Sequence, residues 1–363
     1  MSTSSTPSSR LRDVTFDRTV SEELLNFLRT DTGRRLRAVR DREPMLFDIQ
    51  LRSDRPKGSR SWATLYYGLT SLLDVDESKG RFRLRAHKTH QAAGGFDPSW
   101  SQWMSCSEVD AIWDDVERYL ARTQPLVQER WTAKEGRVHA TLASGNSDAF
   151  RIINREASPS FLDTTTKDAI GAEVWAAVGT ALQSADGSEK WWPNTMTVGN
   201  SLDFLAVDVG GRLALIEAKH HSATGMIAKV AAQVGSYARL YSYLLQDDQQ
   251  GALQLIDEML KQRVQLGLAR NGVLYLTQPV RIAPIVAIGP GRPSTAARER
   301  LWKVAQVLDS VPPLRHPRPS GPPVTVEPLE VWYVDASGRI AAIERAGDID
   351  PTKEMGPPTR ERD

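Results

Sequence analysis

Two short apolar runs, separated by a glycine pair, form the segment Ser201-Leu-Asp-Phe-Leu-Ala-Val-Asp-Val-Gly-Gly-Arg-Leu-Ala-Leu-Ile-Glu-Ala-Lys219. Val, Leu, Ile and Phe dominate both runs, and Gly210-Gly211 between them is typical of a turn. The pattern predicts a β-hairpin with strands over residues 202–209 and 213–219. Asp203 stands at the start of the first strand, and Glu217 and Lys219 stand at the end of the second.

The length of the turn decides whether these charged side chains meet. A two-residue turn would place Asp203 opposite Ala218, on the wrong side of the ribbon from Glu217. A three-residue loop with one glycine in the left-handed region forms a bulge and brings Asp203 opposite Glu217 instead. Glu217 and Lys219 are two residues apart and share a face. We therefore expect all three side chains to converge at one end of the hairpin.

Two interpretations of this cluster are open. A carboxylate pair beside a lysine can hold a divalent cation and a water nucleophile, as hydrolysis of a phosphodiester requires. The same residues can instead form a salt bridge between Lys219 and one of the acids, because charges on a half-buried surface need partners. The hairpin alone does not decide between the two, so its neighbours in the sequence matter.

Two predicted helices flank the hairpin. The helix over residues 227–245 carries Gln233 and Tyr237, which are four residues apart and therefore lie on one face. The helix over residues 164–182 carries Glu173 among apolar residues, where a glutamate is more often a flanking residue than a ligand.

This order of elements resembles the PD-(D/E)XK nuclease superfamily: a helix with Glu173, a strand with Asp203, a strand that ends in Glu217-Ala218-Lys219, and a helix with Gln233 and Tyr237. The Gln-x-x-x-Tyr element is similar to the RecB-like branch. The resemblance covers about residues 160 to 290, and its motifs are short. Leu202 occupies the place of the proline in the family name, a departure that members of the superfamily often share.

The resemblance implies an α/β fold, α+β overall, with a restriction-endonuclease-like core whose central mixed β-sheet is flanked by helices. It implies that Asp203, Glu217, Glu173 and the backbone carbonyl of Ala218 bind Mg²⁺ or Mn²⁺. Lys219 would orient or help to deprotonate the attacking water and stabilise the transition state. Gln233 and Tyr237 would hold Lys219 and the scissile phosphate in place. The alternative for these last two is a surface glutamine and a tyrosine that flanks the core.

Composition constrains the class of protein. The 363 residues include 46 basic and 45 acidic ones, so any nucleic-acid surface must be local and not a product of bulk charge. A single cysteine, Cys106, excludes an intramolecular disulfide and a multi-cysteine zinc site within one chain, and it favours a reducing cytoplasm.

No apolar run is long enough to span a membrane, and the first ten residues lack the apolar region of a secretory signal. We expect a cytoplasmic protein without a membrane partner.

The length of the chain and the change in composition along it predict two domains between polar tails. We expect a disordered tail over residues 1–20, an N-terminal α+β domain over 21–157, the nuclease-like domain over 158–345 and a flexible tail over 346–363. Within the N-terminal domain, helices are predicted over 24–42, with Gly33 as a break, and over 107–122. Strands are predicted over 44–51, 61–69 and 80–87. A further hairpin is predicted over 138–153, just before the domain boundary.

Basic and aromatic residues alternate in part of the N-terminal domain. Arg81, Arg83 and Arg85 fall on a predicted strand, where they could track phosphates, and Trp62 and Tyr66 lie nearby, where they could stack on bases. The alternative is that the arginines lie on a solvent-exposed strand face and that the aromatic residues belong to the core. A run of charges is more often such a solvated face than a binding site.

The leading hypothesis is a metal-dependent nuclease, a hydrolase that cuts phosphodiester bonds with Mg²⁺ or Mn²⁺, with DNA favoured over RNA as substrate. Restriction, repair and defence against phage would all suit such an enzyme. The N-terminal domain would select the substrate, bind a protein partner or form a homo-oligomer. One alternative is a non-catalytic nucleic-acid-binding or scaffold protein built on a nuclease-like core. Another is an unrelated interaction module in which the hairpin acids only form salt bridges.

Overall fold

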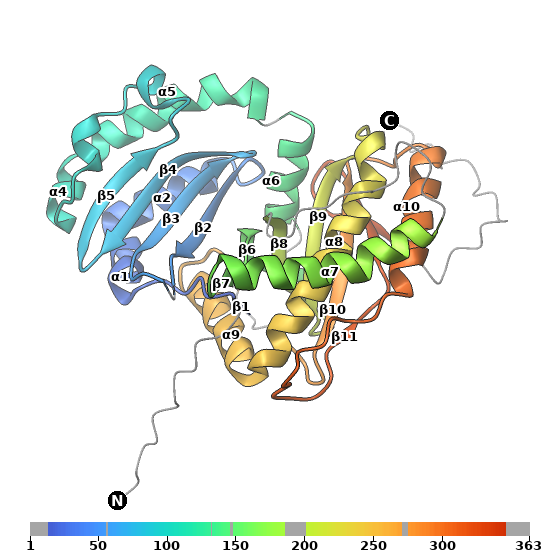
Figure 1. Cartoon of the computed structure of the whole chain (residues 1–363). Helices are drawn as coiled ribbons and strands as arrows, with labels where there is room; N and C mark the ends of the chain where they lie inside the picture. The colour runs from blue at the N-terminus through green and yellow to red at the C-terminus, as the bar shows by residue number, and fades with distance from the viewer. Residues whose placement is uncertain are drawn as a thin grey trace, which may run out of the picture.

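The computed structural model describes residues 14–55, 57–131, 133–145, 148–185, 201–270 and 275–345. Within them the strands form three sheets, and the largest sheet is mixed and flanked by helices. The predicted α/β class, α+β overall, is confirmed at this level. Figure 1 shows a smaller sheet, in blue, and the larger sheet on opposite sides of helix α6. None of the described helices has both the length and the hydropathy needed to cross a membrane.

The N-terminal unit is a four-stranded antiparallel sheet, in the order β2-β3-β4-β5, with helices on one face. Its elements are α1 (Glu22–Arg29), α2 (Asp31–Arg42), β2 (Phe47–Ser53), β3 (Ser61–Tyr67), β4 (Thr70–Ser78), β5 (Arg81–Ala86), α3 (Gln91–Gly94), the 3-10 helix η1 (Pro98–Ser101), α4 (Cys106–Ala111) and α5 (Trp113–Trp131). Three of these strands agree with the sequence prediction, which missed β4.

Side-chain caps decide where the first two helices begin. The Ser21 hydroxyl accepts a hydrogen bond from the Leu24 N–H at the start of α1, and Thr30 caps α2 in the same way through the Gly33 N–H. The predicted break at Gly33 is therefore wrong, because the break falls at Thr30. Gly33 is instead a point of close packing: a Cβ atom there would lie 2.4 Å from the Leu28 backbone.

The C-terminal unit contains the large sheet, in the order β13-β12-β10-β9-β8-β6, with β11 also paired to β10. Its elements are α6 (Glu135–Gly145), β6 (Phe150–Ala157), β7 (Ser160–Phe161), α7 (Thr164–Ser184), β8 (Leu202–Asp208), β9 (Leu213–His220), α8 (Thr224–Asp247), α9 (Gln249–Gln265), β10 (Arg281–Gly289), α10 (Thr295–Asp309), β11 (Thr325–Val326), β12 (Glu330–Val334) and β13 (Ile340–Arg345). β9, β10 and β12 run parallel, whereas β6, β8 and β13 pair antiparallel with their neighbours.

One sequence prediction is corrected around residue 150. The predicted hairpin over 138–153 is helix α6 followed by strand β6, and both elements pack with the large sheet. The apolar residues Val138 and Leu142 are four apart and pack together in the core below the sheet, which is helical spacing and not strand alternation. We describe α6 with the C-terminal unit for this reason, and the domain boundary near residue 158 stays a prediction.

Hydrophobic side chains fill both faces of the large sheet. Leu205, Leu213 and Leu215 pack with helices α7, α8 and α10 on one face. Phe204 and Ile216, their neighbours in the chain, point to the other face, where α6 packs. The hairpin β8–β9 is thus buried on both sides, so a charged residue at its end needs partners. The ribbon in Figure 1 shows α7 and α8 crossing in front of the sheet.

The two units pack against each other through buried polar contacts. The Arg155 guanidinium of β6 donates to the Gly68 carbonyl at 2.6 Å and stacks over the Tyr66 ring at 4.6 Å. Gln262 of α9 accepts from the Val20 N–H at 2.9 Å and donates to the Val20 carbonyl at 3.1 Å. Because both groups are buried, these bonds fix the N-terminal sheet relative to the large one.

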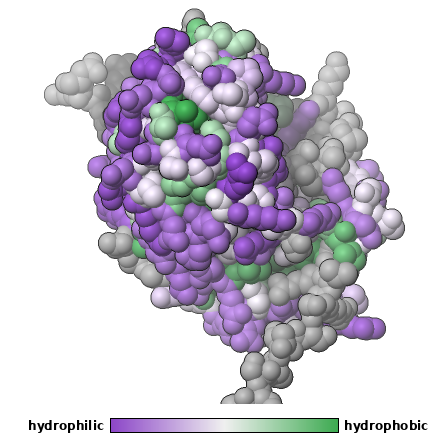
Figure 2. All heavy atoms as spheres, turned by 90° about the vertical axis from the view of Figure 1, so that its left-hand side faces the viewer, coloured by the Kyte–Doolittle hydropathy of each residue, from purple (hydrophilic) through white to green (hydrophobic). Residues whose placement is uncertain are grey.

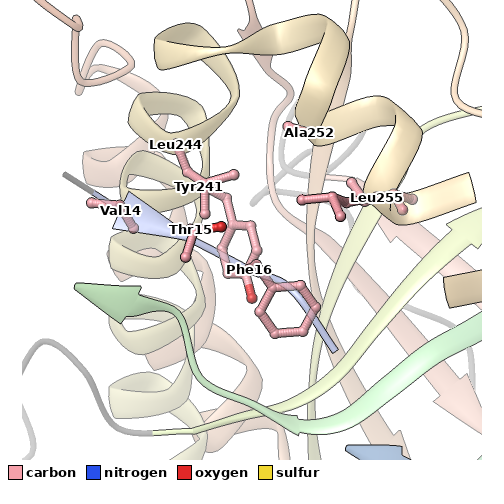
Figure 3. A pocket seen from close by; sticks show the side chains of 8 residues that line it. Val14, Thr15, Phe16, Tyr241, Leu244, Ala252 and Leu255 are labelled. Carbon is pink, nitrogen blue, oxygen red and sulfur yellow. The ribbon is translucent and has the colours of Figure 1, made fainter. Parts of the chain in front are cut away.

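The segment before α1 is ordered from residue 14 onward, which corrects the predicted tail over 1–20. Strand β1 (Val14–Thr15) pairs antiparallel with β7, and Phe16 packs edge-on against Tyr241 of α8. Figure 3 shows these residues around a small hollow with a volume of about 10 Å³, room for about one water molecule. Residues 1–13 and the predicted tail over 346–363 lie outside the described residues.

Candidate active site

The loop of the β8–β9 hairpin has the geometry that the sequence predicted. Val207 pairs with Leu213, and the Asp208 N–H donates to the Arg212 carbonyl at 3.1 Å, which leaves a three-residue loop closed by Gly211 at φ 70°. Phe204 pairs with Ile216, so the same register places Asp203 opposite Glu217. The bulged glycine loop is therefore what brings the two acids together.

Asp203 is held as a carboxylate by three groups around it. Its Oδ2 atom accepts a hydrogen bond from the Ala218 N–H at 2.8 Å and lies 4.0 Å from Lys219 Nζ. Nε2 of His139 is 3.4 Å from the same oxygen. Burial by itself would raise the pKa of Asp203, but His139, Lys219 and the backbone donor outweigh burial and hold this pKa below the ordinary range.

Glu217 is the second acid of the pair, and its pKa shifts in the opposite direction from that of Asp203. Its side chain is 1 % exposed, and its carboxyl lies within hydrogen-bonding reach of Asp203. Burial, followed by the negative charge of Asp203, raises the pKa of Glu217 well above the ordinary value. The lowered pKa of Asp203 and the raised pKa of Glu217 together favour an ionised Asp203 beside a protonated Glu217. A cation placed between them would favour loss of that proton.

The two predicted residues of α8 both approach Glu217. Gln233 Nε2 donates to Glu217 Oε1 at 3.2 Å, so this side chain contacts the acid and not Lys219 as the sequence analysis expected. The Tyr237 hydroxyl is buried and makes no hydrogen bond to any described residue. Burial raises the pKa of Tyr237, which therefore stays a neutral phenol. Tyr237 is buried, whereas Gln233 is partly exposed.

Helix α6 contributes two residues that the sequence analysis missed. Glu135 Oε1 forms an ion pair with Lys219 Nζ, and His139, one turn further along, faces Asp203. His139 is 4 % exposed, and neither of its ring nitrogens has a hydrogen-bond partner among the described residues. The spacing Glu135-x-x-x-His139 was a usable signal, but the predicted hairpin over 138–153 placed His139 on a strand and so separated it from Glu135.

Lys219 is a cation in this arrangement. Burial would lower its pKa, but Asp203 and Glu135 reverse the effect and raise the pKa above the ordinary value. The amine therefore keeps its proton, which suits orientation of a water or charge stabilisation better than removal of a proton.

Glu173 does not join the cluster. Its side chain is exposed on α7, and no hydrogen bond or ion pair among the described residues involves it. The resemblance had placed a helical glutamate in the site, and the glutamate that the structure brings there is Glu135, on α6. The Ala218 N–H is committed to Asp203, whereas the role of the Ala218 carbonyl as a ligand stays a prediction.

The donor set fits a divalent cation. Glu135, His139 and Asp203 offer ligand atoms that all lie within 4.8 Å of one another, and Glu217 adjoins Asp203. Carboxylate oxygens suit Mg²⁺ and Mn²⁺, and an imidazole nitrogen shifts preference toward transition metals. Nε2 of His139 is turned to the carboxylates of Asp203 and Glu135, at 3.4 and 3.8 Å, and Nδ1 has no hydrogen-bond partner among the described residues.

Comparison with known proteins gives no match: neither a family model, nor a curated protein, nor a solved structure matches this chain.

Proposed function

We propose that the chain is a metal-dependent nuclease that hydrolyses phosphodiester bonds, with DNA favoured over RNA. The single observation that carries the proposal is the meeting of Asp203, Glu217, Lys219 and His139 at the end of one buried hairpin. A structural salt bridge would need only Lys219 and one acid. Two adjacent carboxyls with a buried histidine 3.4 Å from one of them are better explained as a cation site.

We also propose that the large sheet is a restriction-endonuclease-like core. The support is the placement of the acids on an antiparallel hairpin, β8–β9, that is followed by helix α8 and the parallel strand β10. This arrangement agrees with the resemblance drawn from the motifs. In this proposal the helix that begins the core is α6, which precedes strand β6. Helix α7 lies later in the chain, between β7 and β8.

In the proposed reaction the residues have separate roles. Asp203, Glu217, His139 and Glu135 would hold Mn²⁺ or Mg²⁺, and the ion when bound would supply a Lewis acid and an acidified water. The Lys219 ammonium would orient the attacking water and stabilise charge on the phosphate. Gln233 would fix the Glu217 carboxyl through its amide. Tyr237 offers a buried hydroxyl beside Glu217.

The test is a cleavage assay with circular duplex DNA, linear duplex DNA, single-stranded DNA and RNA, each with Mg²⁺ or Mn²⁺. Lys219→Ala and Asp203→Asn should each lower the rate by about 100-fold or more, which is the usual effect of losing one group that stabilises a transition state. Lys229→Ala is the matched control, because Lys229 is exposed on α8. Cleavage that persists in both site variants would refute the assignment. Silence of the wild type on every substrate would favour the non-catalytic scaffold.

A further inference from the structure

The N-terminal sheet has one face that its helices do not cover. Arg52, Trp62, Asp76 and Arg83 form a row across strands β2 to β5, because each is the cross-strand partner of the next. Alternation places this row on the side opposite Ile49, Ala63, Val75 and Leu84, which pack with the helices. Gln50, Thr64, Asp74 and Arg85 form the adjacent row.

Arginines on this face are held in place by a buried carboxylate. Asp76 is fully buried, and its Oδ2 lies 2.9 Å from Arg83 Nε, 2.8 Å from Arg85 Nε and 3.8 Å from Arg60 Nη1. One carboxylate thus orients three guanidinium groups, each of which has five N–H donors. Asp74 also pairs with Arg85 at 3.1 Å, and Asp54 lies 3.7 Å from Arg60. The donors that these acids do not occupy are already held in place for a ligand, so binding costs less side-chain entropy.

Two indole rings accompany these cations. The Arg60 guanidinium lies 4.9 Å from the centroid of Trp62, and the Arg83 guanidinium lies 4.7 Å from the centroid of Trp103, which follows η1 at the outer edge of β5. Trp62 and Trp103 are both partly exposed. Rigid arginines interleaved with accessible aromatics are the combination that binds a phosphate chain and stacks on its bases.

The row leads toward the candidate active site. At its β2 end, Arg52 donates to the Arg155 carbonyl at 3.0 Å and to Glu156 Oε2 at 2.9 Å, both on β6. The next residue of β6, Ala157, pairs with Leu202, the neighbour of Asp203. The β2 end of the row therefore adjoins β6, the neighbour in the sheet of the strand that carries Asp203.

We propose that this face, defined by Arg60, Trp62, Arg83, Arg85 and Trp103, binds single-stranded nucleic acid. Stacking requires bases that are free of a partner strand, so a single strand fits the indoles and a duplex does not. An acidic peptide would satisfy the arginines but not the indoles. Figure 2 shows that the side of the N-terminal unit turned away from the large sheet is mostly hydrophilic, with hydrophobic residues in small groups. The proposal rests on the proposed function in that the bound strand would be the substrate.

Binding can be tested apart from catalysis, with the full chain in EDTA and fluorescently labelled oligothymidine, oligouridine, a DNA duplex and polyglutamate. The double variant Arg60→Gln, Arg83→Gln should weaken binding of the single strands by about tenfold or more and reduce the slope of log affinity against log salt by about 0.7 for each lost phosphate contact. Arg85 still pairs with Asp76 in this variant, so the fold should persist. Arg34→Gln is the matched control, because Arg34 also pairs with an acid but lies on α2.

Trp103→Leu tests the same face without disturbing Asp76 and should weaken single-strand binding by about fivefold or more through lost stacking. It decides the matter if the double variant fails to fold in a thermal melt. If the variants lose oligothymidine and oligouridine binding equally, the face binds both DNA and RNA. If they lose binding of only one oligonucleotide, the face binds that type of nucleic acid. Wild-type affinity in Trp103→Leu, tighter binding of the duplex than of the single strands, or preference for polyglutamate would overturn the proposal. Single-strand binding without any cleavage would uphold it and refute only the nuclease function.

Discussion

Nε2 of His139 lies 3.4 Å from Oδ2 of Asp203, and no hydrogen bond to another described residue explains why this imidazole is buried. The histidine comes from α6, which stands between the two sheets, and the aspartate comes from the hairpin of the large sheet. We therefore expect His139 to be a metal ligand that favours Mn²⁺ over Mg²⁺.

Replacement of His139 by alanine should weaken Mn²⁺ binding by about tenfold or more and change Mg²⁺ binding less, because Mg²⁺ prefers oxygen donors. Isothermal titration of both ions against both proteins measures the difference. His87→Ala, in the N-terminal unit, is the control. Unchanged Mn²⁺ affinity in His139→Ala would remove this residue from the site.

Glu217→Gln should stabilise the metal-free protein as pH rises. The pKa of Glu217 is raised in the fold, so the wild type is favoured while Glu217 is protonated and loses that stability as pH rises through the raised pKa. Asp203 acts in the opposite sense, because its pKa is lowered and its contribution is lost as pH falls. Above the ordinary glutamate value of about 4.3, the melting temperature of Glu217→Gln relative to wild type should increase with pH.

This comparison is made in EDTA with Glu299→Gln as control, since Glu299 is exposed on α10. A difference in melting temperature that is constant with pH, or that shrinks as pH rises, would contradict a protonated Glu217. Glu217→Gln should at the same time lose affinity for Mn²⁺, because an amide cannot replace a carboxylate ligand.

Arg212 should be the main electrostatic support of the hairpin loop. Its guanidinium lies 2.6 Å from Asp208, 2.6 Å from Glu327 and 2.7 Å from Glu330, and Glu330 is 1 % exposed. Arg212→Met leaves buried carboxylates with less compensation and should lower the free energy of unfolding in urea by about 3 kcal/mol. Arg34→Met, which breaks an exposed pair, should change it by about 0.5 kcal/mol or less. Equal effects of the two changes would be against this role.

Gly211→Ala should destabilise the loop that sets the register of Asp203 and Glu217. Gly211 has φ 70°, and a Cβ atom there would lie 2.4 Å from Thr277 Cγ2. Gly267→Ala is a close control, because Gly267 has φ 68° but no atom within 4 Å of the added Cβ. Backbone strain alone costs about 1 kcal/mol, and the contact with Thr277 should make the loss at Gly211 larger. If Gly211→Ala is as stable as Gly267→Ala, the Thr277 side chain moves away at no cost and the predicted additional loss is wrong.

Local spacing carried most of the successful sequence prediction. The glycine pair fixed the loop, and the loop fixed the pairing of Asp203 with Glu217. Helical spacing placed Gln233 on one face with Tyr237, and the resemblance made it a site residue. Its contact with Glu217 depends on how α8 crosses β9. These are relationships within a short stretch of chain, where period and turn chemistry decide the geometry.

Residues brought from a distance could not be predicted in the same way. Glu135 and His139 reach the hairpin only because α6 packs on the sheet face formed by Phe204 and Ile216. The segment 138–153 mixes small, polar and apolar residues, so the strand prediction concealed the helix. Glu173 was chosen because its helix precedes the hairpin in the chain, but order in the sequence does not determine which helix end meets the acids.

Anomalous diffraction from crystals of the full chain soaked in Mn²⁺ tests the central claim most directly. We predict one strong peak within ligand distance, about 2.2 Å, of carboxylate oxygens from both Asp203 and Glu217, with His139 Nε2 also in contact. A peak elsewhere with none at this site, or an unaltered Asp203–Glu217–Lys219 cluster at saturating Mn²⁺, would contradict the account.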